Sequence, residues 1–291
     1  MFIDNPPLQE QKILFNNKEV CFKIQRDDLI DPLVSGNKLR KLKGWYQKAF
    51  ELGALKMTWV TFGGAYSNHI IATAAFCNKY SINCIGVIRG DEEFDNHYLI
   101  ECRKLGMELE FVSRSEFRSK EELYERYKQK GYFVIPEGGR GFAGMLGFEE
   151  LINSWEIEPE FVVHASATAT TACGLKKALT NRGWNTVVVA VLVLKNLEEQ
   201  KAATLEFLGT HGGIEFLDGY HMGGYAKTPS IFLEFFKNIE SKISFPIDPV
   251  YVGKALFAFL SEDRFNQKNT VFLHTGGQLG RFSDRFVKAL Y

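Results

Sequence analysis

Short apolar runs alternate with helix-patterned segments along most of this 291-residue chain. Alternation of this length predicts right-handed crossovers, and hence mostly parallel sheets with helices on both faces. The predicted strands are 58–62, 84–88, 108–112, 132–135, 161–165, 186–193, 214–217 and 270–273. The predicted helices are 67–79, 96–105, 119–130, 170–181, 196–208, segments near 229–241 and 250–261, and 279–289. The run 186–193 is apolar without interruption, which is typical of a strand covered on both faces.

The first 25 residues depart from this alternation. Two apolar runs, 13–15 and 20–24, flank the polar residues 16–19. This spacing predicts a β-hairpin ahead of the first long helix.

The composition excludes several classes of protein. Acidic and basic residues balance at 35 each, so no electrostatic nucleic-acid-binding surface is expected. No run approaches the roughly 18–20 apolar residues of a membrane span, and residues 1–7 lack the pattern of a signal peptide. The five cysteines are scattered and without metal-ligand spacing, which indicates reduced thiols in a cytoplasmic protein and no metal site.

Lys38 is the first candidate for chemistry. It follows Gly36-Asn37, where the backbone can turn sharply, and precedes the helical pattern of residues 39–50. The positive end of a helix and a nearby apolar wall both disfavour a charged lysine. Such a lysine can act as a nucleophile and form a Schiff base with an aldehyde. The alternative is a solvated basic first turn, because lysines are common on helix surfaces.

Two loops join a predicted strand to a predicted helix, which is where open α/β sheets place ligands. In the first, Gly63–His69, Ser67 would cap the following helix, a role that explains the residue without any ligand. The second consists of Ser166, Ala167, Thr168, Ala169, Thr170 and Thr171. Hydroxyls and free amides at a helix start form an anion site suited to phosphate. A Ser/Thr-rich capped turn is the alternative for this loop.

Four segments, in order along the chain, resemble the family of 1-aminocyclopropane-1-carboxylate (ACC) deaminases and D-cysteine desulfhydrases. These are pyridoxal 5'-phosphate (PLP) enzymes of the tryptophan-synthase-β type. The matching segments are Arg26–Leu29 with Ser35–Leu42, Gly63–His69, Asp248–Lys254 and His274–Gly277.

The resemblance implies a fold class: α/β, with two open twisted, mostly parallel sheets, helices on both faces and a cofactor cleft between domains. It implies a large PLP-binding domain of residues 1–45 and 150–291, in which the N-terminal segment packs with the second half of the chain. Residues 46–149 would form a small α/β domain. It also implies a homodimer.

The resemblance also assigns roles around the cofactor. Lys38 would hold PLP as a Schiff base and later act as a base. Lys41 and the 166–171 loop would bind the phosphate, although a surface helix lysine is the alternative for Lys41. Asn68 would reach the PLP ring oxygen, and Thr275 the pyridine nitrogen.

Further residues would serve the substrate. Ser67 and the amides of Asn68 and His69 would hold its carboxylate, and Ser67 would join proton transfer. His69 stands where the family often has glutamine, and it brings a titratable ring. Tyr225 and Tyr251 would face the reaction as catalytic groups. A packed core tyrosine is the alternative for Tyr225. Tyr220 lies nearby in the sequence, and it could be the residue that matches the family tyrosine in place of Tyr225.

Three further positions depart from the family pattern. Ala167 and Ala169 replace the usual glycines, and a methyl group costs about 1–2 kcal/mol if the backbone there is left-handed. Either the loop has ordinary dihedral angles or its phosphate affinity is reduced. Val252 replaces the glutamate of ACC deaminases and the small hydroxyl residue of desulfhydrases, and it can neither accept nor donate a hydrogen bond.

We therefore expect a PLP-dependent lyase or deaminase that acts on a small amino acid and releases ammonia and a 2-keto acid. D-Cysteine would give pyruvate, ammonia and sulfide, and ACC would give 2-oxobutanoate and ammonia. Thr275 matches the desulfhydrases, since deaminases carry leucine there. The alternatives are elimination on another β-substituted amino acid, a PLP-binding protein without turnover, and a phosphate-ligand binder unrelated to PLP. The sequence does not reveal the chirality of the substrate.

Overall fold

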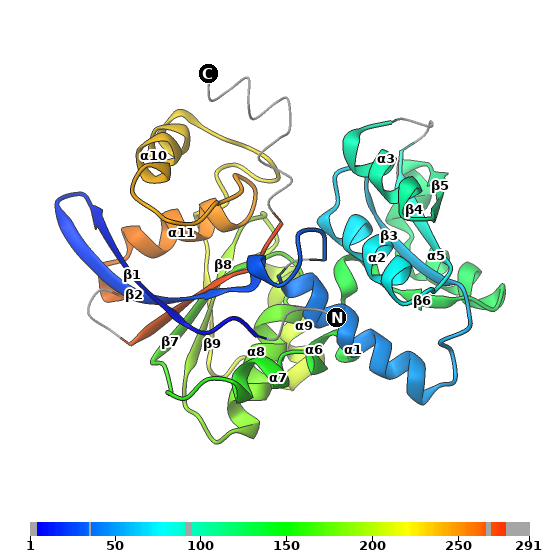
Figure 1. The fold of residues 1–291 in the computed structure, drawn as a ribbon, viewed down its shortest axis with the longest axis horizontal. Helices are drawn as coiled ribbons and strands as arrows, with labels where there is room; N and C mark the ends of the chain where they lie inside the picture. Colours follow the sequence, from blue (N-terminus) through cyan, green and yellow to red (C-terminus); the bar gives the residue numbers. More distant parts are fainter. Residues whose placement is uncertain (1–4, 35, 91–94, 266–268, 278–291) are drawn as a thin grey trace. The chain divides into compact units, whose positions relative to one another are not determined.

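A computed structural model describes residues 5–34, 36–90, 95–265 and 269–277 of the chain (Figure 1). The chain divides into two compact units. The first contains residues 1–37 and 148–291, and the second contains residues 38–147. Each unit has its own sheet.

The sheet of the first unit has the strand order β1-β2-β10-β7-β8-β9. Its strands are β1 (Gln9–Phe15), β2 (Lys18–Arg26), β7 (Phe161–Ser166), β8 (Val187–Leu192), β9 (Ile214–Leu217) and β10 (Thr270–His274). Only β1 and β2 pair antiparallel; they form the predicted hairpin. Asn16 and Asn17 at its turn both have positive φ, of 49° and 61°, as a tight two-residue hairpin turn requires. The β2 strand pairs with β10, so the N-terminal segment does pack with the second half of the chain.

Helices cover both faces of this sheet (Figure 1). They are α7 (Glu149–Asn153), α8 (Thr170–Asn181), α9 (Leu197–Leu208), α10 (Ser230–Glu240) and α11 (Val252–Ser261). Phe236 of α10 and Phe259 of α11 are fully buried in the main core, where Val163 of β7 and Val191 of β8 also lie. The intervening β8 residues, Val188, Ala190 and Leu192, are also buried, which explains the uninterrupted apolar run.

The sheet of the second unit is fully parallel, in the order β5-β4-β3-β6. Its strands are β3 (Trp59–Gly64), β4 (Cys84–Arg89), β5 (Met107–Val112) and β6 (Phe133–Ile135). Its helices are α1 (Asn37–Glu51), which begins one residue before this unit, α2 (Asn68–Lys79), α3 (His97–Lys104), α4 (Arg114–Arg118), α5 (Lys120–Gln129) and α6 (Phe142–Leu146). One face of the sheet packs Val60 and Phe62 against Phe117, Leu123 and Tyr127.

The predicted fold class of two mostly parallel sheets with covering helices is confirmed. Three helices, α4, α6 and α7, were not predicted, because five residues are too few to show a helical period. Short 3₁₀ turns add η1 (Asp27–Leu29), η2 (Glu137–Gly139) and η3 (Asp263–Phe265). The predicted helix 279–289 lies outside the described residues.

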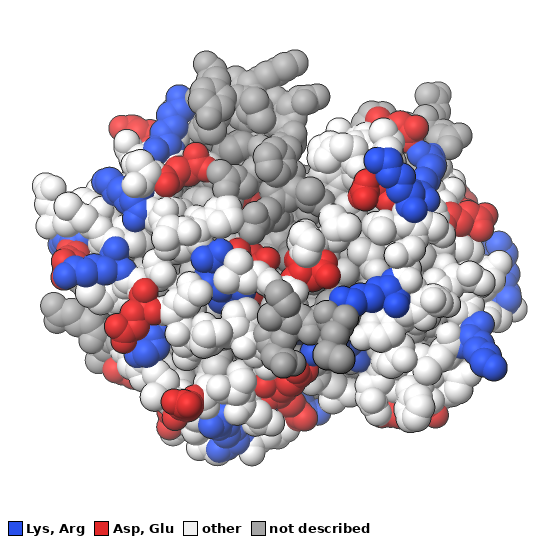
Figure 2. Space-filling model, viewed as in Figure 1, with Lys and Arg blue, Asp and Glu red and all other residues white. Residues whose placement is uncertain are grey.

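Within the described ranges, none of the helices is long and apolar enough to cross a membrane. The part of the chain that the structure describes also has no cluster of three or more His, Cys, Asp or Glu residues arranged for a metal ion. On the face drawn in Figure 2, acidic and basic side chains are interspersed over both units.

Candidate active site

The backbone just before Lys38 is fixed to the end of β10. Gly36 N donates to Asp27 O at 2.9 Å, and Asn37 N donates to Thr275 O at 3.2 Å. Gly36 has a φ of +66°, and a Cβ built there would lie 1.8 Å from Thr275 O. No residue with a side chain fits this approach unless the backbone moves. The contacts with the end of β10 therefore fix the backbone directly before Lys38.

The side chain of Asn37 makes a second connection. It is buried, and its Nδ2 donates to Thr171 Oγ1 at 3.0 Å, in the first turn of α8. A threonine hydroxyl that accepts this bond can still donate its own hydrogen elsewhere. Sequence reasoning gave Asn37 no role of its own, and the only signal was its position next to Lys38.

The Arg-Asp-Asp motif forms a buried scaffold for this region. Arg26 binds Asp28 through two hydrogen bonds of 2.7 Å each. Gln25 Nε2 donates to Asp27 Oδ1 at 3.2 Å. His274 accepts from Gly276 N at 3.2 Å through Nδ1, so its hydrogen lies on Nε2, which is 2.7 Å from Pro246 O. A motif that was noticed through the resemblance therefore serves to hold β2, β10 and the segment before Lys38 together.

The 166–171 loop begins α8 without a capping side chain. Its N-cap residue is Ala169, with φ 56° and ψ −28°, in the left-handed region. Thr170 N donates to Thr168 O at 2.6 Å, which closes a three-residue turn around Ala169. The φ of Ala167 is not positive. The prediction of ordinary dihedral angles is therefore confirmed for Ala167 and wrong for Ala169. The left-handed backbone of Ala169 costs about 1–2 kcal/mol.

This loop has the donors that an anion needs. Alanine has no side-chain acceptor, so the alternative of a side-chain-capped turn is wrong. The first-turn N–H groups of a helix, here including those of Thr171 and Ala172, have no acceptor within the helix. Ser166 Oγ donates to Gln200, and Asn196 Nδ2 donates to Ala167 O at 2.9 Å, so α9 and the residue before it hold the loop. The donor set fits a phosphate at the positive end of α8.

In the second unit, Lys41 is buried, with only 1% of its surface exposed. The alternative of a surface helix lysine is therefore wrong. Its Nζ donates to Gly138 O at 3.1 Å, and Trp45 Nε1 donates to Gly139 O at 3.2 Å. Gly139 has a φ of +70°, and a Cβ there would lie 3.2 Å from Lys41 Cβ. No function was predicted for the glycine-rich segment 137–141, yet Gly138 and Gly139 contact Lys41 directly.

His69 is buried and neutral. Its Nε2 is 2.8 Å from Thr61 Oγ1, which donates its one hydrogen to Ile135 O at 3.0 Å. Nε2 must therefore carry the hydrogen, and Nδ1 is a buried acceptor with no hydrogen-bond partner among the described residues. Burial lowers the pKa of His69 well below its usual value, and the charges of Lys38 and Lys41 act in the same direction. His69 thus resembles the neutral glutamine of the family more than a charged imidazolium.

Ser67 and Asn68 lie at the start of α2. Ser67 Oγ accepts hydrogen bonds from His69 N at 3.2 Å and Ile70 N at 3.4 Å, so its predicted role as a helix cap is confirmed. Its hydroxyl hydrogen is not used by these bonds and can serve a ligand. Asn68 Oδ1 is buried and has no hydrogen-bond partner within the described ranges. A buried amide left in this way costs about 1–3 kcal/mol, which a bound ligand would remove.

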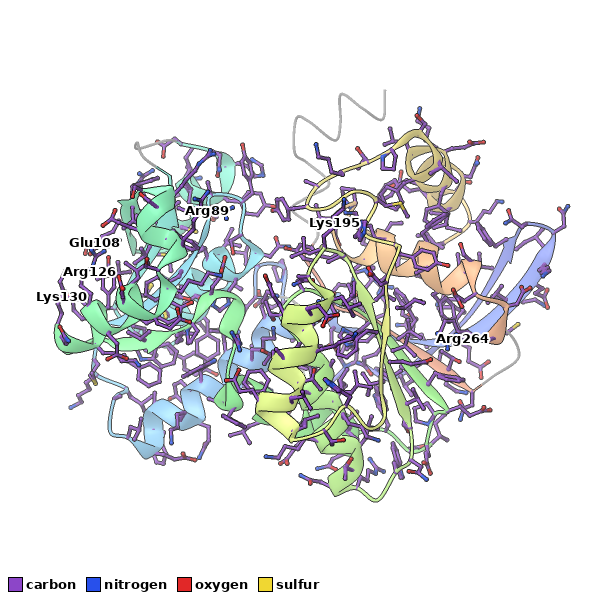
Figure 3. The ribbon with its side chains drawn as sticks, turned by 180° about the vertical axis from the view of Figure 1, so that it is seen from behind. Arg89, Glu108, Arg126, Lys130, Lys195 and Arg264 are labelled. Carbon is purple, nitrogen blue, oxygen red and sulfur yellow. The ribbon has the colours of Figure 1, made fainter. Side chains whose placement is uncertain are left out.

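Tyr225 lies in the 218–229 loop and is 48% exposed, so the alternative of a packed core tyrosine is wrong. Tyr220 is the packed neighbour: its hydroxyl donates to Glu262 Oε1 at 3.0 Å. Glu262 also pairs with Arg264, labelled in Figure 3, through a contact of 3.3 Å. Tyr251 begins α11, and its N–H donates to Asp248 Oδ1 at 2.7 Å.

Val252, the departure from the family pattern, is 1% exposed and lies in the main core of the first unit. Its amide donates to Asp248 Oδ2 at 2.9 Å. Its side chain therefore serves packing, which an apolar residue suits.

The predicted residues thus gather in two groups. In the first unit, Asn37 joins Thr171 at the phosphate loop to Thr275 at the end of β10. In the second unit, Lys38 and Lys41 act electrostatically on His69, which follows Ser67 and Asn68. Tyr225 and Tyr251 belong to the first unit, on separate elements.

The chain is 31% identical to a putative ACC deaminase of Thermotoga maritima over 298 residues, covering 95% of each protein. It is 28% identical to a D-cysteine desulfhydrase of Salmonella paratyphi A, covering 89% of this chain and 88% of that protein. The crystal structure of an ACC deaminase homologue superposes with a TM-score of 0.78 at 25% identity, covering 99% of this chain and 93% of that one. No protein-family model matches the chain. The chain belongs to the family of ACC deaminases and D-cysteine desulfhydrases, which are PLP-dependent enzymes.

Proposed function

We propose that this protein releases ammonia and a 2-keto acid from a small β-substituted amino acid, with D-cysteine as the first substrate to test. One observation carries the proposal. Asn37, directly before Lys38, is hydrogen-bonded both to Thr171 at the phosphate loop and to Thr275 at the end of β10. The lysine nucleophile, the phosphate donors and the proposed partner of the pyridine nitrogen are therefore tied to one residue.

PLP fits the residues at both groups. The N–H groups at the start of α8, with Thr171 and Lys41, would hold its phosphate. The amide nitrogen of Asn68 would donate to the PLP ring oxygen, and its buried Oδ1 would accept from a donor of the bound ligand. When bound, PLP supplies an electron sink for charge that develops at the substrate Cα.

The chain's own residues would then carry the proton transfers. Lys38 would hold PLP and would also be the base that removes the Cα proton of the substrate. Ser67 would donate its unused hydroxyl hydrogen to the substrate carboxylate. Tyr225 and Tyr251 would serve as acid–base groups, and the half-exposed Tyr225 can reach solvent for this purpose.

Two positions favour elimination over opening of the ACC ring. Thr275 would hydrogen-bond the pyridine nitrogen without protonating it fully, which weakens the electron sink and suits β-elimination. Val252 is buried in the core and provides no carboxylate for ring opening. Since the Thermotoga maritima relative is named a putative ACC deaminase, ACC is the second substrate to test.

The proposal includes the organisation of the protein. Residues 1–45 and 150–291 would act as the large PLP-binding domain and residues 46–149 as the small domain. We also propose that the protein is a homodimer and that it is located in the cytoplasm. Light scattering coupled to gel filtration tests the dimer, and a monomer at micromolar concentration would exclude it.

The decisive experiment is a visible absorbance spectrum with added PLP, before and after D-cysteine, together with assays of sulfide and pyruvate. A Lys38→Ala variant should lose the cofactor band. A Lys48→Ala variant, in which an exposed lysine of the same helix is removed, should keep it. Absence of a Lys38-dependent band would overturn the proposal. A band without sulfide release would redirect the search to ACC and other amino acids.

A further inference from the structure

Lys254, in the first turn of α11, is fully buried and holds a distant loop. Its Nζ donates to His221 O at 2.9 Å and to Gly224 O at 2.7 Å. Both carbonyls belong to the 218–229 loop between β9 and α10. Burial of a lysine is expensive unless its hydrogen bonds are made, so these contacts hold the loop as well as the lysine.

The two carbonyls are the acceptors of consecutive turns. Gly224 N donates to His221 O at 2.9 Å, and Lys227 N donates to Gly224 O at 3.3 Å. Tyr225 lies inside the second turn. One ammonium group therefore fixes both turns, and with them the backbone that carries Tyr225.

This loop needs such support. Met222 and Ala226 have φ values of 56° and 51°, and Gly223 and Gly224 have φ values of 91° and 124°. Left-handed backbone is strained at each residue that is not glycine. Strain of this kind persists where surrounding contacts fix the conformation.

The turn from Asp248 into α11 is held by hydrogen bonds and close packing. The Asp248 carboxylate accepts from the N–H groups of Val250, Tyr251 and Val252 at 2.8, 2.7 and 2.9 Å. A Cβ at Gly253 would lie 2.6 Å from Asp248 O, so the turn into α11 is tightly packed. These contacts fix the first turn of α11, in which Lys254 lies.

We propose that Lys254 is a positioning residue that fixes Tyr225, the acid–base candidate of the loop, with respect to Tyr251. This inference rests on the proposed function, because it takes the role of Tyr225 from there. Lys254 itself touches neither substrate nor cofactor in this scheme; it acts through the two turns.

The charge of Lys254 makes its hold on the loop dependent on pH, and this dependence can be measured. Burial lowers the pKa of Lys254 to about 8, and the Asp248 carboxylate acts in the opposite direction. His221, whose backbone carbonyl accepts from Lys254, also carries a titratable ring, and the Nδ1 of that ring accepts from Gly223 N at 3.0 Å. A neutral amine is a weaker donor than an ammonium. The hold on the loop should therefore weaken as the pH rises through about 8.

Hydrogen exchange of the 218–229 segment tests the hold directly, in the full-length protein with and without PLP. We expect at least tenfold faster exchange in Lys254→Met, and a smaller increase in Lys254→Gln, which keeps an N–H donor without the charge. After correction for intrinsic rates, exchange in the unsubstituted protein should rise above pH 8, and exchange in Lys254→Met should not. Lys176→Met is the matched control, because Lys176 Nζ also donates to a backbone carbonyl, that of Thr186, at 3.2 Å. Unchanged exchange in Lys254→Met would overturn the proposal.

Turnover tests the link to Tyr225. With the substrate identified, Lys254→Met should lower kcat at least tenfold and leave KM within twofold. The double variant Lys254→Met/Tyr225→Phe should be no slower than Tyr225→Phe alone, because both changes remove one function. Independent, multiplying losses would overturn the role of Lys254 in positioning Tyr225. If the unsubstituted protein releases no keto acid, the proposed function fails, and hydrogen exchange alone decides whether Lys254 holds the loop.

Discussion

The helices α2 and α8 both follow a buried strand, but their amino ends are satisfied in opposite ways. At α2, Ser67 accepts two backbone N–H groups, so the helix completes its own cap. At α8, the N-cap residue is a left-handed alanine that has no acceptor to offer. A helix start that caps itself needs no ligand, whereas one without a cap leaves its N–H groups to an anion. The contrast separates a helix start that is capped by Ser67 from one whose first N–H groups remain for the phosphate.

Giving α8 its own cap should abolish this contrast. An Ala169→Asp substitution places a carboxylate where the phosphate would sit, in a backbone conformation that aspartate tolerates. We expect the PLP dissociation constant to rise about 100-fold, which corresponds to about 2.7 kcal/mol. Titration followed by absorbance measures this change. Pyridoxal, which lacks the phosphate, is the control ligand, and its binding should change little. Equal losses for both ligands would contradict a phosphate site at α8.

Protonation should disturb the α2 end. The folded protein keeps His69 neutral well below the usual pKa of 6.5, whereas the unfolded chain takes up a proton near that value. Stability from this group is therefore complete above pH 6.5 and is lost as the pH falls, by at most about 1.4 kcal/mol per unit. Urea unfolding of the cofactor-free protein from pH 7.5 to 5 measures the slope. A His69→Gln variant should lose this part of the slope, and an identical slope in both proteins would exclude His69 as its source.

Removing the α2 cap should cost stability without affecting the phosphate. Ser67→Ala should lower the free energy of unfolding by about 1 kcal/mol, the usual value for a lost serine cap. Urea unfolding of the cofactor-free protein measures this loss, and PLP titration should give an unchanged dissociation constant. Ser67→Asp, which keeps a cap acceptor, should retain the stability. A large loss of PLP affinity in Ser67→Ala would show that the α2 end also binds the phosphate.

Relieving strain at α8 should have the smallest effect. Ala169→Gly removes a methyl group from a left-handed position, and we expect a gain of about 0.5–1 kcal/mol in unfolding free energy after the entropy cost of glycine. Ala167→Gly is the matched control, because Ala167 lacks a positive φ and should gain nothing. A gain at Ala167 equal to that at Ala169 would contradict the assigned backbone strain.

The elements of the fold were predictable from local patterns. The hydrophobic runs indicated each described strand, and the pattern at 170–181 matched α8 at both ends. The Asn16-Asn17 turn and the Ser67 cap also depend on residues close in sequence, so the sequence alone could indicate them. The five-residue helices α4, α6 and α7 were not predicted, because a helical period can be recognised only in a longer segment.

The candidate site was only partly predictable, because its supporting contacts join distant segments. Asn37 meets Thr171 across 134 residues, and Lys254 meets His221 across 33. No local pattern shows either contact. The left-handed backbone of Ala169 was equally invisible, since alanine rarely adopts it and the sequence left both conformations open. The burial of Lys41 likewise depends on the 138–139 loop, about 100 residues away.

The pairing of β2 with β10 also determines when the candidate site can form during synthesis of the chain. Asn37 is held by Thr275, and about 240 residues of chain must be synthesised between them. At about 5–20 residues per second, this delay is about 10–50 s. The second unit, whose sheet contains only residues 59–135, can form its strands during that interval. Lys38 thus leaves the ribosome early, but the backbone before it receives its fixed position only when the last described strand has been synthesised.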